Sequence, residues 1–330
     1  MLPCNANENH SHFEIRKGCV KRFLVLAVFL VAVGSACGST ADGGDDRSLV
    51  IATTTILGDI VANTVGDAVQ VEVLMPIGAD PHDFAPSARQ AARLRDATLV
   101  VANGVGLEEA LLDVLDAAEQ DGVAVMRVGE LVDPQPFVIG SVAGGSEGRA
   151  SSGEEPQDFD PHVWMDPVRM AQAVELIGNR LTTSAGVDVS ASAAAYRTRV
   201  QDLNLEIARM IKAVPAERRR MVTNHFSYGY YADRYGITLL GAVIPAATTG
   251  AETSAADFAA LVELLKREGV SVVFGSTTEP TTLADALAEE VGYEVKVVRL
   301  PTGSLGEPGS GAETYIDMMR LSTRLIVENL

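Results

Sequence analysis

The sequence predicts an α/β protein of two lobes, each with a mainly parallel sheet, joined by a long rigid helix. β-branched apolar runs alternate with helical stretches along most of the chain, which is the pattern of parallel βα units. The composition is 47% hydrophobic but only 5% aromatic, which favours buried parallel strands and Ala-rich helices. A chain of 330 residues is also too long for one small core. These three observations together predict the two-lobed α/β class.

The first lobe is expected to span residues 48–185. Its strands are predicted at 48–54, 69–75, 98–102 and 124–128, and its helices at 56–65, 87–95, 108–120 and 167–182. Ser87 is well placed to cap the second of these helices. Residues 103–106 read Asn-Gly-Val-Gly after a strand, but the third glycine of a dinucleotide-binding fingerprint is absent because position 109 is Glu. We therefore interpret this segment as a compact strand-to-helix turn. Residues 140–158, rich in Gly, Ser and acidic residues, are predicted to form a mobile loop.

The linking segment is expected at residues 186–213. Its helix, from 190 to 213, has no internal Gly or Pro and would be about 36 Å long at the standard helical rise. The second lobe, 214–330, repeats the alternation of strand and helix. Strands are predicted at 220–223, 238–243, 270–274 and 295–300, and helices at 228–235, 254–268, 283–291 and 312–330. The sequence thus predicts the same architecture twice, with a helix as a spine between the halves.

The N-terminus has the pattern of an export signal. Four Lys and Arg residues between positions 16 and 22 precede an apolar stretch at 23–33, which is too short to span a bilayer and suits a secretory signal. Small residues then lead to Cys37, in a segment that resembles a bacterial lipobox although Gly34 departs from the usual Leu, Val or Ile. We expect a signal peptide at 1–36 and a lipid-anchored flexible tether at 37–47. Ordinary cleavage to a soluble product is the alternative, and Val20 is an alternative start.

Charge and cysteine content exclude two classes of protein. The formal net charge of −18 argues against nucleic acid as a partner, because its binding needs clustered Lys and Arg. Cys4 and Cys19 precede the predicted cleavage point, so the mature chain would keep only Cys37 and has no disulfide framework. We expect an exported monomer, periplasmic or held at the outer face of the cell membrane, whose only membrane contact is the N-terminal lipid.

Three histidines, His82, His162 and His225, are the only ones that follow the predicted signal peptide. Two lie in Pro-bracketed turns and the third directly follows a predicted strand, and open α/β sheets place ligands at such strand ends. Three imidazoles without a nearby cysteine suit Zn²⁺ and tolerate Mn²⁺. The sequence therefore predicts a metal site in the cleft between the lobes, with His82 and His162 from the first lobe and His225 from the second.

These segments resemble those of the zinc/manganese ABC-transporter substrate-binding proteins. The family's Pro-His-(Asp/Glu)-(Tyr/Phe)-x-Pro-Ser segment is matched at 81–87, its Asp-Pro-His-x-Trp-x-Asp-Pro segment at 160–167, and its third site with the following Arg-Tyr-Gly at 225–236. The resemblance extends from about residue 48 to the end, including 303–309 and 315–319. It implies an extracytoplasmic receptor, not an enzyme, that delivers metal to an ABC permease and its ATPase.

The resemblance also bears on which metal binds and on the fourth ligand. Manganese-type members often carry Glu at the third position and zinc-type members His, so His225 favours Zn²⁺, with Mn²⁺ as the alternative. The family usually supplies a fourth ligand, an Asp, at the position occupied here by Gly303. Water or another oxygen ligand would complete a tetrahedral site, and Glu279 is a further candidate.

Two other functions stay open at this stage. Three histidines plus water is also the arrangement of catalytic zinc, which makes a hydrolase or lyase the rival hypothesis. Against it, we find no evident general base beside the motifs, and we interpret Asp83 and Asp166 as turn caps or as acceptors that hold the histidine rings. Members of the family have also been described as surface adhesins.

The aromatic residues near these motifs are interpreted as structural. Trp164 is interpreted as a packing residue beside the cleft, and the tyrosines interpreted as interlobe core are Tyr228, Tyr230 and Tyr231.

Overall fold

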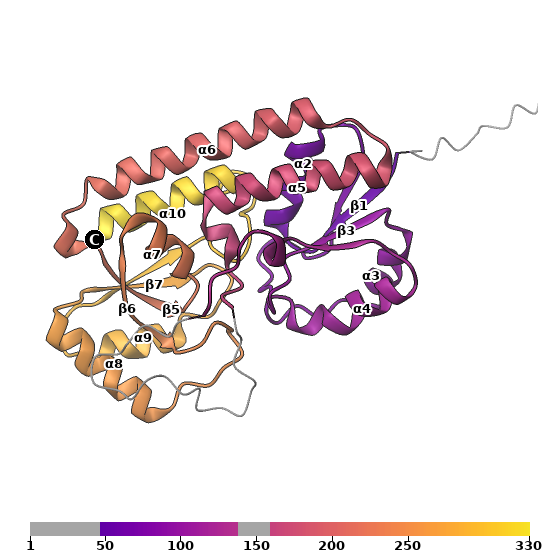
Figure 1. Cartoon of the computed structure of the whole chain (residues 1–330). Helices are drawn as coiled ribbons and strands as arrows, with labels where there is room; N and C mark the ends of the chain where they lie inside the picture. The colour runs from indigo at the N-terminus through magenta and orange to yellow at the C-terminus, as the bar shows by residue number, and fades with distance from the viewer. Residues whose placement is uncertain (1–46, 138–158) are drawn as a thin grey trace, which may run out of the picture. The chain divides into compact units, whose positions relative to one another are not determined.

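Two four-stranded parallel sheets carry the fold, and both have the same strand order (Figure 1). The computed structural model describes residues 47–137 and 159–330. The predicted signal peptide, the predicted tether up to residue 46 and the predicted loop at 140–158 lie outside the described residues. Residues 47–330 belong to one compact unit.

The first sheet has the order β2-β1-β3-β4, and every neighbouring pair is parallel. Its strands are β1 (Leu49–Ala52), β2 (Gln70–Val73), β3 (Leu99–Ala102) and β4 (Val125–Arg127). Every residue of β1 and β3 is buried, as expected for a parallel sheet covered by helices on both faces. The strand order reverses between β1 and β3, so their carboxyl ends flank the crevice where open α/β sheets bind ligands.

The second sheet repeats this topology with the order β6-β5-β7-β8. Its strands are β5 (Arg220–His225), β6 (Thr238–Ile244), β7 (Val272–Ser276) and β8 (Lys296–Leu300). The strand order reverses between β5 and β7, and β5 ends at His225. The predicted pair of parallel α/β sheets is therefore confirmed.

Helices follow most strands, and their first residues explain where they begin. Thr54 caps α2 by accepting a hydrogen bond from the Leu57 N–H, and Ser87 forms a reciprocal capping box with Gln90 at the start of α3, as predicted. The α-helices are α2 (Thr55–Val65), α3 (Ala88–Arg93), α4 (Leu112–Gln120), α5 (Pro167–Ala185), α6 (Ser190–Lys212), α7 (Gly229–Tyr235), α8 (Ala255–Glu268), α9 (Thr282–Glu290) and α10 (Tyr315–Asn329). The 3₁₀ helices are η1 (Leu94–Asp96), η2 (Glu109–Leu111), η3 (Val128–Leu131), η4 (Val163–Met165) and η5 (Ala216–Arg218).

Helix α6 is the predicted linking helix and contains 23 residues. It packs against α2, α5 and α10, so it lies alongside helices of both halves (Figure 1). Its buried side chains recur every three or four residues: Ala193, Tyr196, Val200, Leu203, Ile207 and Ile211. One core cluster includes Val50 of β1 and Phe274 of β7. This cluster is therefore shared by both sheets, while each sheet also has a separate core cluster of its own. The lobe limits at 48–185 and 214–330 stay predictions.

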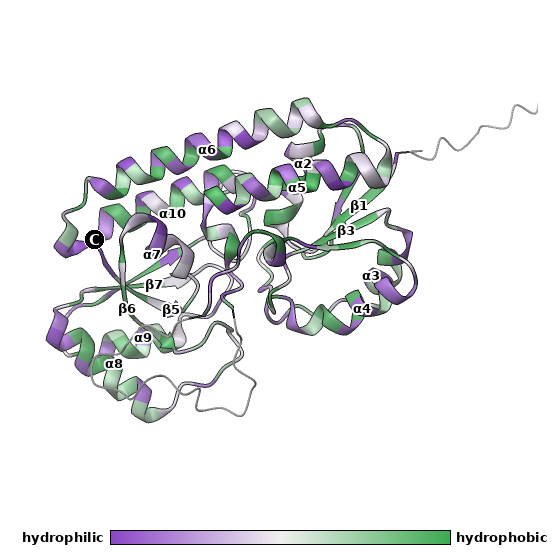
Figure 2. Cartoon of the chain, viewed as in Figure 1, coloured by the Kyte–Doolittle hydropathy of each residue, from purple (hydrophilic) through white to green (hydrophobic). Residues whose placement is uncertain are grey.

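Hydropathy follows this burial. The central strands β1 and β3 of the first sheet are apolar, whereas α6 alternates polar and apolar residues along its length (Figure 2). Among the described residues, no helix combines the length and apolar character that a membrane crossing requires.

One predicted helix begins differently from the expectation. The stretch predicted as a helix from residue 108 contains η2 and then α4, which begins at Leu112. Glu108 itself is not helical, because its carboxylate accepts hydrogen bonds from the backbone N–H groups of Asn103 and Gly104 in the preceding turn. This turn is the segment that we interpreted as a compact strand-to-helix connection.

Candidate metal centre

The two histidines of the first half occupy turns built in the same way. Each is the third residue of an Asp-Pro-His tripeptide, at 80–82 and at 160–162. In both, the Asp Oδ1 accepts a hydrogen bond from the histidine backbone N–H, at 3.0 Å for His82 and 2.9 Å for His162. Such a local bond folds the chain tightly around a proline whose φ is already fixed. The tripeptide therefore sets the direction of each histidine before any metal is present.

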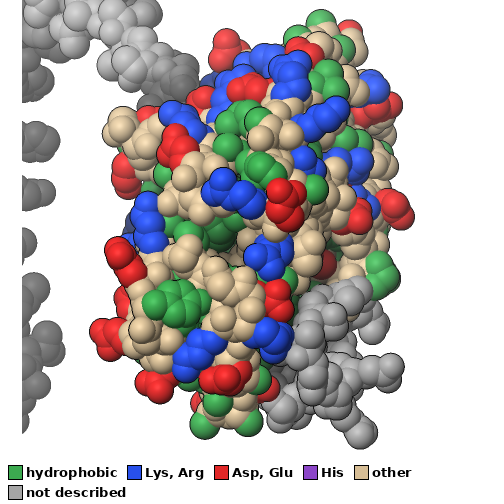
Figure 3. Space-filling model, turned by 90° about the vertical axis from the view of Figure 1, so that its left-hand side faces the viewer, with side chains coloured by type: hydrophobic (Ala, Val, Ile, Leu, Met, Phe, Trp, Pro, Cys, Tyr) green, Lys and Arg blue, Asp and Glu red, His purple; other side chains and the backbone are tan. Residues whose placement is uncertain are grey.

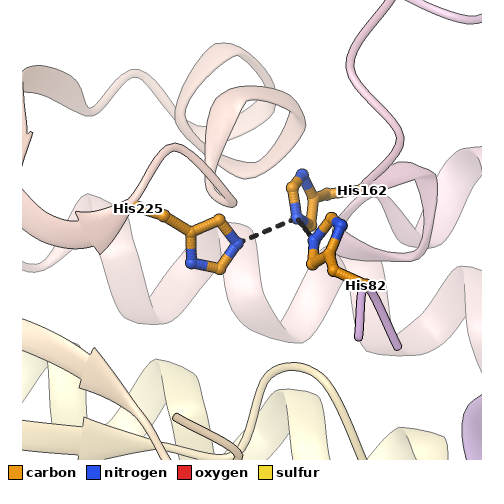
Figure 4. Close-up of side chains that lie close together, drawn as sticks. All are labelled: His82, His162 and His225. Carbon is orange, nitrogen blue, oxygen red and sulfur yellow. Dashed lines mark hydrogen bonds between the residues drawn. The ribbon is translucent and has the colours of Figure 1, made fainter. Parts of the chain in front are cut away.

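The three predicted histidines converge (Figure 4). The Nε2 atoms of His82 and His162 are 3.3 Å apart, and those of His162 and His225 are 3.1 Å apart. Zn–N bonds of about 2.0–2.1 Å in a tetrahedron place neighbouring nitrogens about 3.3 Å apart. Two of the three nitrogen pairs thus have the spacing of ligands around one zinc ion, and all three ligand atoms lie within 4.8 Å of one another.

All three side chains are buried, with 1–4% of each residue exposed. Figure 3 shows one face of the molecule, on which acidic and basic side chains are intermixed and no histidine is visible. Burial, followed by the two neighbouring rings, lowers the pKa of His82 well below its ordinary value. Burial also lowers the pKa of His162, although Asp160 opposes this shift. The site therefore favours neutral imidazoles, the form that binds metal.

Carboxylates fix the orientation of two rings. Asp160 Oδ1 lies 2.8 Å from His162 Nδ1, and Glu279 Oε1 lies 3.1 Å from His225 Nδ1. An ionised carboxylate can only accept, so each Nδ1 carries the proton and each Nε2 presents a lone pair to the cluster. Two lone pairs 3.1 Å apart have no proton to share. A cation between them removes this repulsion, which is the arrangement of carboxylate–histidine–metal sites.

The carboxylates that hold the rings are not the two that the sequence suggested. Asp166 caps α5 through the Val168 N–H and accepts hydrogen bonds from Arg169 and Arg234, so its interpretation as a cap is confirmed. Asp83 is exposed. The ring-holding role falls instead to Asp160 and Glu279. Asp160 could have been recognised from its place two residues before a histidine. Glu279 was a candidate only for the fourth ligand, and nothing near it in the sequence indicated a contact with the outer nitrogen of His225.

The candidates for a fourth ligand have distinct positions. Gly303 lines the cluster, together with Asp80, Ser227 and Thr302, around a cavity of about 10 Å³, which is room for one water molecule. A Cβ at position 303 would lie 2.8 Å from Thr278 Oγ1, so no side chain fits there without moving Thr278. Glu279 contacts Nδ1 of His225, the nitrogen that faces away from the cluster. An open position filled by water fits this geometry better than Glu279.

The predicted aromatic core residues are buried beside the cluster. The Trp164 ring centroid lies 5.2 Å from that of His162, and its Nε1–H donates to the Thr302 carbonyl at 2.8 Å. Tyr228, Tyr230 and Tyr231 are buried, as predicted, and belong to the core cluster that includes residues of both sheets. The Tyr230 hydroxyl donates to the Asp160 carbonyl at 2.8 Å, so an α7 side chain supports the turn that carries His162.

A two-lobed α/β fold with three converging histidines between its sheets is the architecture of a metal-binding receptor of an ABC transporter. The family model described as zinc-uptake complex component A, periplasmic, matches residues 50–329. The chain belongs to this family, whose members are substrate-binding proteins of metal ABC transporters and not enzymes.

The individual relatives are named for different metals. The manganese-binding lipoprotein MntA of Halalkalibacterium halodurans is 28% identical over 320 residues, covering 96% of this chain and 99% of that protein. The zinc-binding lipoprotein AdcA of Streptococcus pneumoniae is 28% identical over 316 residues, and the match spans 93% of this chain but 60% of that protein. The solved structure of the periplasmic zinc-binding protein TroA from Treponema pallidum has a TM-score of 0.74 and 26% identity, covering 86% of this chain and 99% of that one.

Proposed function

We propose that this protein is an extracytoplasmic receptor that captures one Zn²⁺ ion with His82, His162 and His225 and delivers it to an ABC permease driven by its ATPase. The observation that carries the proposal is the convergence of three buried rings, with His162 Nε2 3.3 Å from that of His82 and 3.1 Å from that of His225, and all three ligand atoms within 4.8 Å of one another. Family membership supports the transport role, and the converging nitrogens support the ligand set.

The donor set supports zinc over manganese. Imidazole nitrogen suits Zn²⁺, whereas carboxylate, carbonyl and water oxygens suit Mn²⁺, and a given site generally binds Zn²⁺ more tightly than Mn²⁺. In the described part of the chain, the cluster of metal-ligating side chains consists of three histidines without a carboxylate. The space beside Gly303 would let a water complete four-coordination. Manganese is the second candidate, because MntA is named for manganese.

The test is metal analysis and competitive calorimetric titration of the mature protein, purified without a His-tag and stripped of metal. We expect one Zn²⁺ per chain. His225→Ala should weaken binding by more than the ~10–100-fold that is lost when a group hydrogen-bonded to a ligand is removed, because here the ligand itself is lost. Arg320→Ala, which changes a pair between α10 and α6, serves as the control and should bind as wild type. Preferential retention of Mn²⁺ would overturn the choice of metal, and no stoichiometric metal would overturn the receptor function.

The cellular location belongs to the same proposal. Cys37 would carry the lipid that anchors the receptor outside the cytoplasmic membrane, with residues 1–36 removed. Several relatives are named lipoproteins, which supports this placement. A receptor released without lipid is the alternative.

A further inference from the structure

We propose that Ser304 is a positioning residue for the metal site, which slows the release of metal by holding the two halves of the molecule together beside it. The inference rests on the proposed function, because it concerns the same three-histidine site. Ser304 is buried and directly follows Gly303, which lines the cavity at the cluster. It is not one of the clustered ligands.

The hydroxyl of Ser304 joins two segments of the first half. The Gly78 N–H donates to Ser304 Oγ at 2.9 Å, and Thr55 Oγ1 lies 3.2 Å from the same oxygen. Gly78 belongs to the turn that leads to His82, and Thr55 is the first residue of α2. Ser304 itself lies in the second half, in the segment that follows β8. One side chain of the second half therefore holds both a histidine turn and a helix of the first half.

The polar groups of this contact satisfy one another. The Ser304 hydroxyl donates its one proton to the Leu305 carbonyl at 3.0 Å, so the Thr55 hydroxyl is the donor toward Ser304. The Leu305 N–H donates in turn to Thr55 Oγ1 at 2.9 Å. We call Thr55, Gly78, Ser304 and Leu305 the bridging contact. Because Thr55 and Ser304 are both buried, loss of either hydroxyl leaves a polar group without its partner.

The bridging contact lies next to the metal site. The Thr302 carbonyl, which belongs to the same segment after β8, accepts a hydrogen bond from Trp164 Nε1 at 2.8 Å. The Trp164 ring lies against that of His162. This one segment thus contacts the neighbourhood of both first-half histidines, while the third, His225, belongs to its own half. The segment therefore fixes how the ligands of the two halves face each other.

The bridging contact should oppose the separation of the halves. An ion held by ligands from both halves leaves when one half withdraws its ligands. The hydrogen bonds of Ser304 and Thr55 cross the same boundary, so they break in the same movement. By linkage, bonds that favour the joined form slow the loss of metal, and bound metal in turn favours these bonds.

The experiment measures the rate at which Zn²⁺ passes from the mature protein to an excess of chelator. We expect Ser304→Ala to raise this rate about tenfold, which corresponds to the loss of one or two ordinary hydrogen bonds between the halves. Thr55→Val should act in the same direction, and Thr55→Ser, which keeps the hydroxyl, should restore slow release. If one of these variants fails to fold, the other supplies the comparison.

The matched control is Ser322→Ala. Ser322 is also buried, and its hydroxyl donates to the Pro301 carbonyl at 3.0 Å, a bond that stays within the second half. Chemical denaturation should show that this variant loses unfolding free energy, as Ser304→Ala does. Its zinc release should nevertheless match the wild type, because the lost bond does not join the halves.

Amide hydrogen exchange provides a second readout. Adding Zn²⁺ to the wild-type protein should slow exchange of the Gly78 and Leu305 N–H groups, which both donate across the halves. Gly122 is the reference, because it is an exposed glycine, like Gly78, whose N–H donates to the Glu119 carbonyl within the first half. Its exchange should change little.

The outcomes separate this inference from the proposed function. Equal release rates in Ser304→Ala and Ser322→Ala, or exchange at Gly78 that does not respond to Zn²⁺, would overturn the role of Ser304 and leave the receptor function standing. A wild-type protein that takes up no Zn²⁺ would overturn the proposed function itself, and this inference with it.

Discussion

At the scale of single residues, Asp160 is held in place by contacts of its carboxylate and of its backbone carbonyl. Its Oδ1 accepts both the backbone N–H and the ring Nδ1–H of His162, at 2.9 Å and 2.8 Å. A side chain at Gly229 would collide with Asp160 Oδ2, so the start of α7 needs glycine there. The Tyr230 hydroxyl supports the Asp160 carbonyl from the same helix. Asp160 therefore connects the His162 ring and the His162 backbone with a helix of the second half.

The lowered pKa values of His82 and His162 predict how metal binding depends on pH. The folded-state pKa values of these two side chains lie below the ordinary value of about 6.5. Zn²⁺ affinity should therefore be flat from about pH 7.5 to 6.5 and should fall at lower pH, as protons begin to compete for Nε2. Titration at several pH values in one buffer series checks this. A loss of affinity already between pH 7.5 and 7 would contradict it.

The same shifts have a consequence for the metal-free protein. A histidine whose folded pKa is lowered contributes stability that is present above the unfolded pKa and is lost as the pH falls toward the folded value. The unfolding temperature of the metal-free protein should therefore decrease below about pH 6.5. The unfolding temperature of the His82→Ala variant should decrease less over the same pH range. Thermal melts of both metal-free proteins measure this difference.

At the scale of elements, Asp166 joins two helices of different halves. It caps α5, and Arg234 of α7 binds it through two hydrogen bonds, at 3.0 Å from Nε and 2.6 Å from Nη2. Asp166 is fully buried, whereas the Arg234 side chain is 35% exposed. Loss of the arginine would leave a buried carboxylate with Arg169 as its remaining cationic partner.

We expect Arg234→Ala to lower the free energy of unfolding by about 1–2 kcal/mol, below the full value for a buried pair because the arginine is partly exposed to solvent. Zinc affinity should change little, since Arg234 contacts none of the histidines. The matched control is Arg320→Ala, which breaks a solvent-exposed pair with Glu206 and should cost at most about 1 kcal/mol. Chemical denaturation of both variants provides the measurement. Equal losses of unfolding free energy in the two variants would count against a special role of the buried Asp166.

At the scale of the whole molecule, α6 packs against helices of both halves, and one core cluster includes residues of both sheets. Because α6 is a continuous helix and not a pair of extended strands, relative movement of the halves has to bend or shift packed helices. The proposed capture of metal by ligands from both halves would therefore involve a small closure. The two turns with His82 and His162 and the end of β5 supply the atoms that would close on the ion.

The location of the whole protein also gives a testable outcome. The chain expressed in a bacterium that processes lipoproteins should appear in the membrane fraction with a lipid-modified Cys37 at its N-terminus. Cys37→Ser should move it to the soluble extracytoplasmic fraction without changing its zinc affinity. Mass spectrometry of the mature N-terminus decides the question, and an unmodified N-terminus in the wild-type protein would show ordinary cleavage.

Much of this architecture could be predicted from the sequence, because local patterns determine it. Alternating apolar runs indicated every strand of both sheets, and Ser87 marked the start of α3. The family motifs brought His82, His162 and His225 into one site. Partners distant in sequence could not be predicted, such as Glu279 for His225 and Arg234 for Asp166. These pairs depend on how helices and strands pack, and no local residue pattern indicates them.

The fluorescence of Trp164 should report on metal binding. This residue is the single tryptophan of the chain, it is buried, and its ring lies against that of His162. Indole emission responds to nearby charge and to collisions with imidazole, and a divalent ion bound by His162, as proposed, would change both. The fluorescence of the unlabelled protein should therefore follow the arrival and departure of metal in real time, and each signal would come from one known position beside the ion.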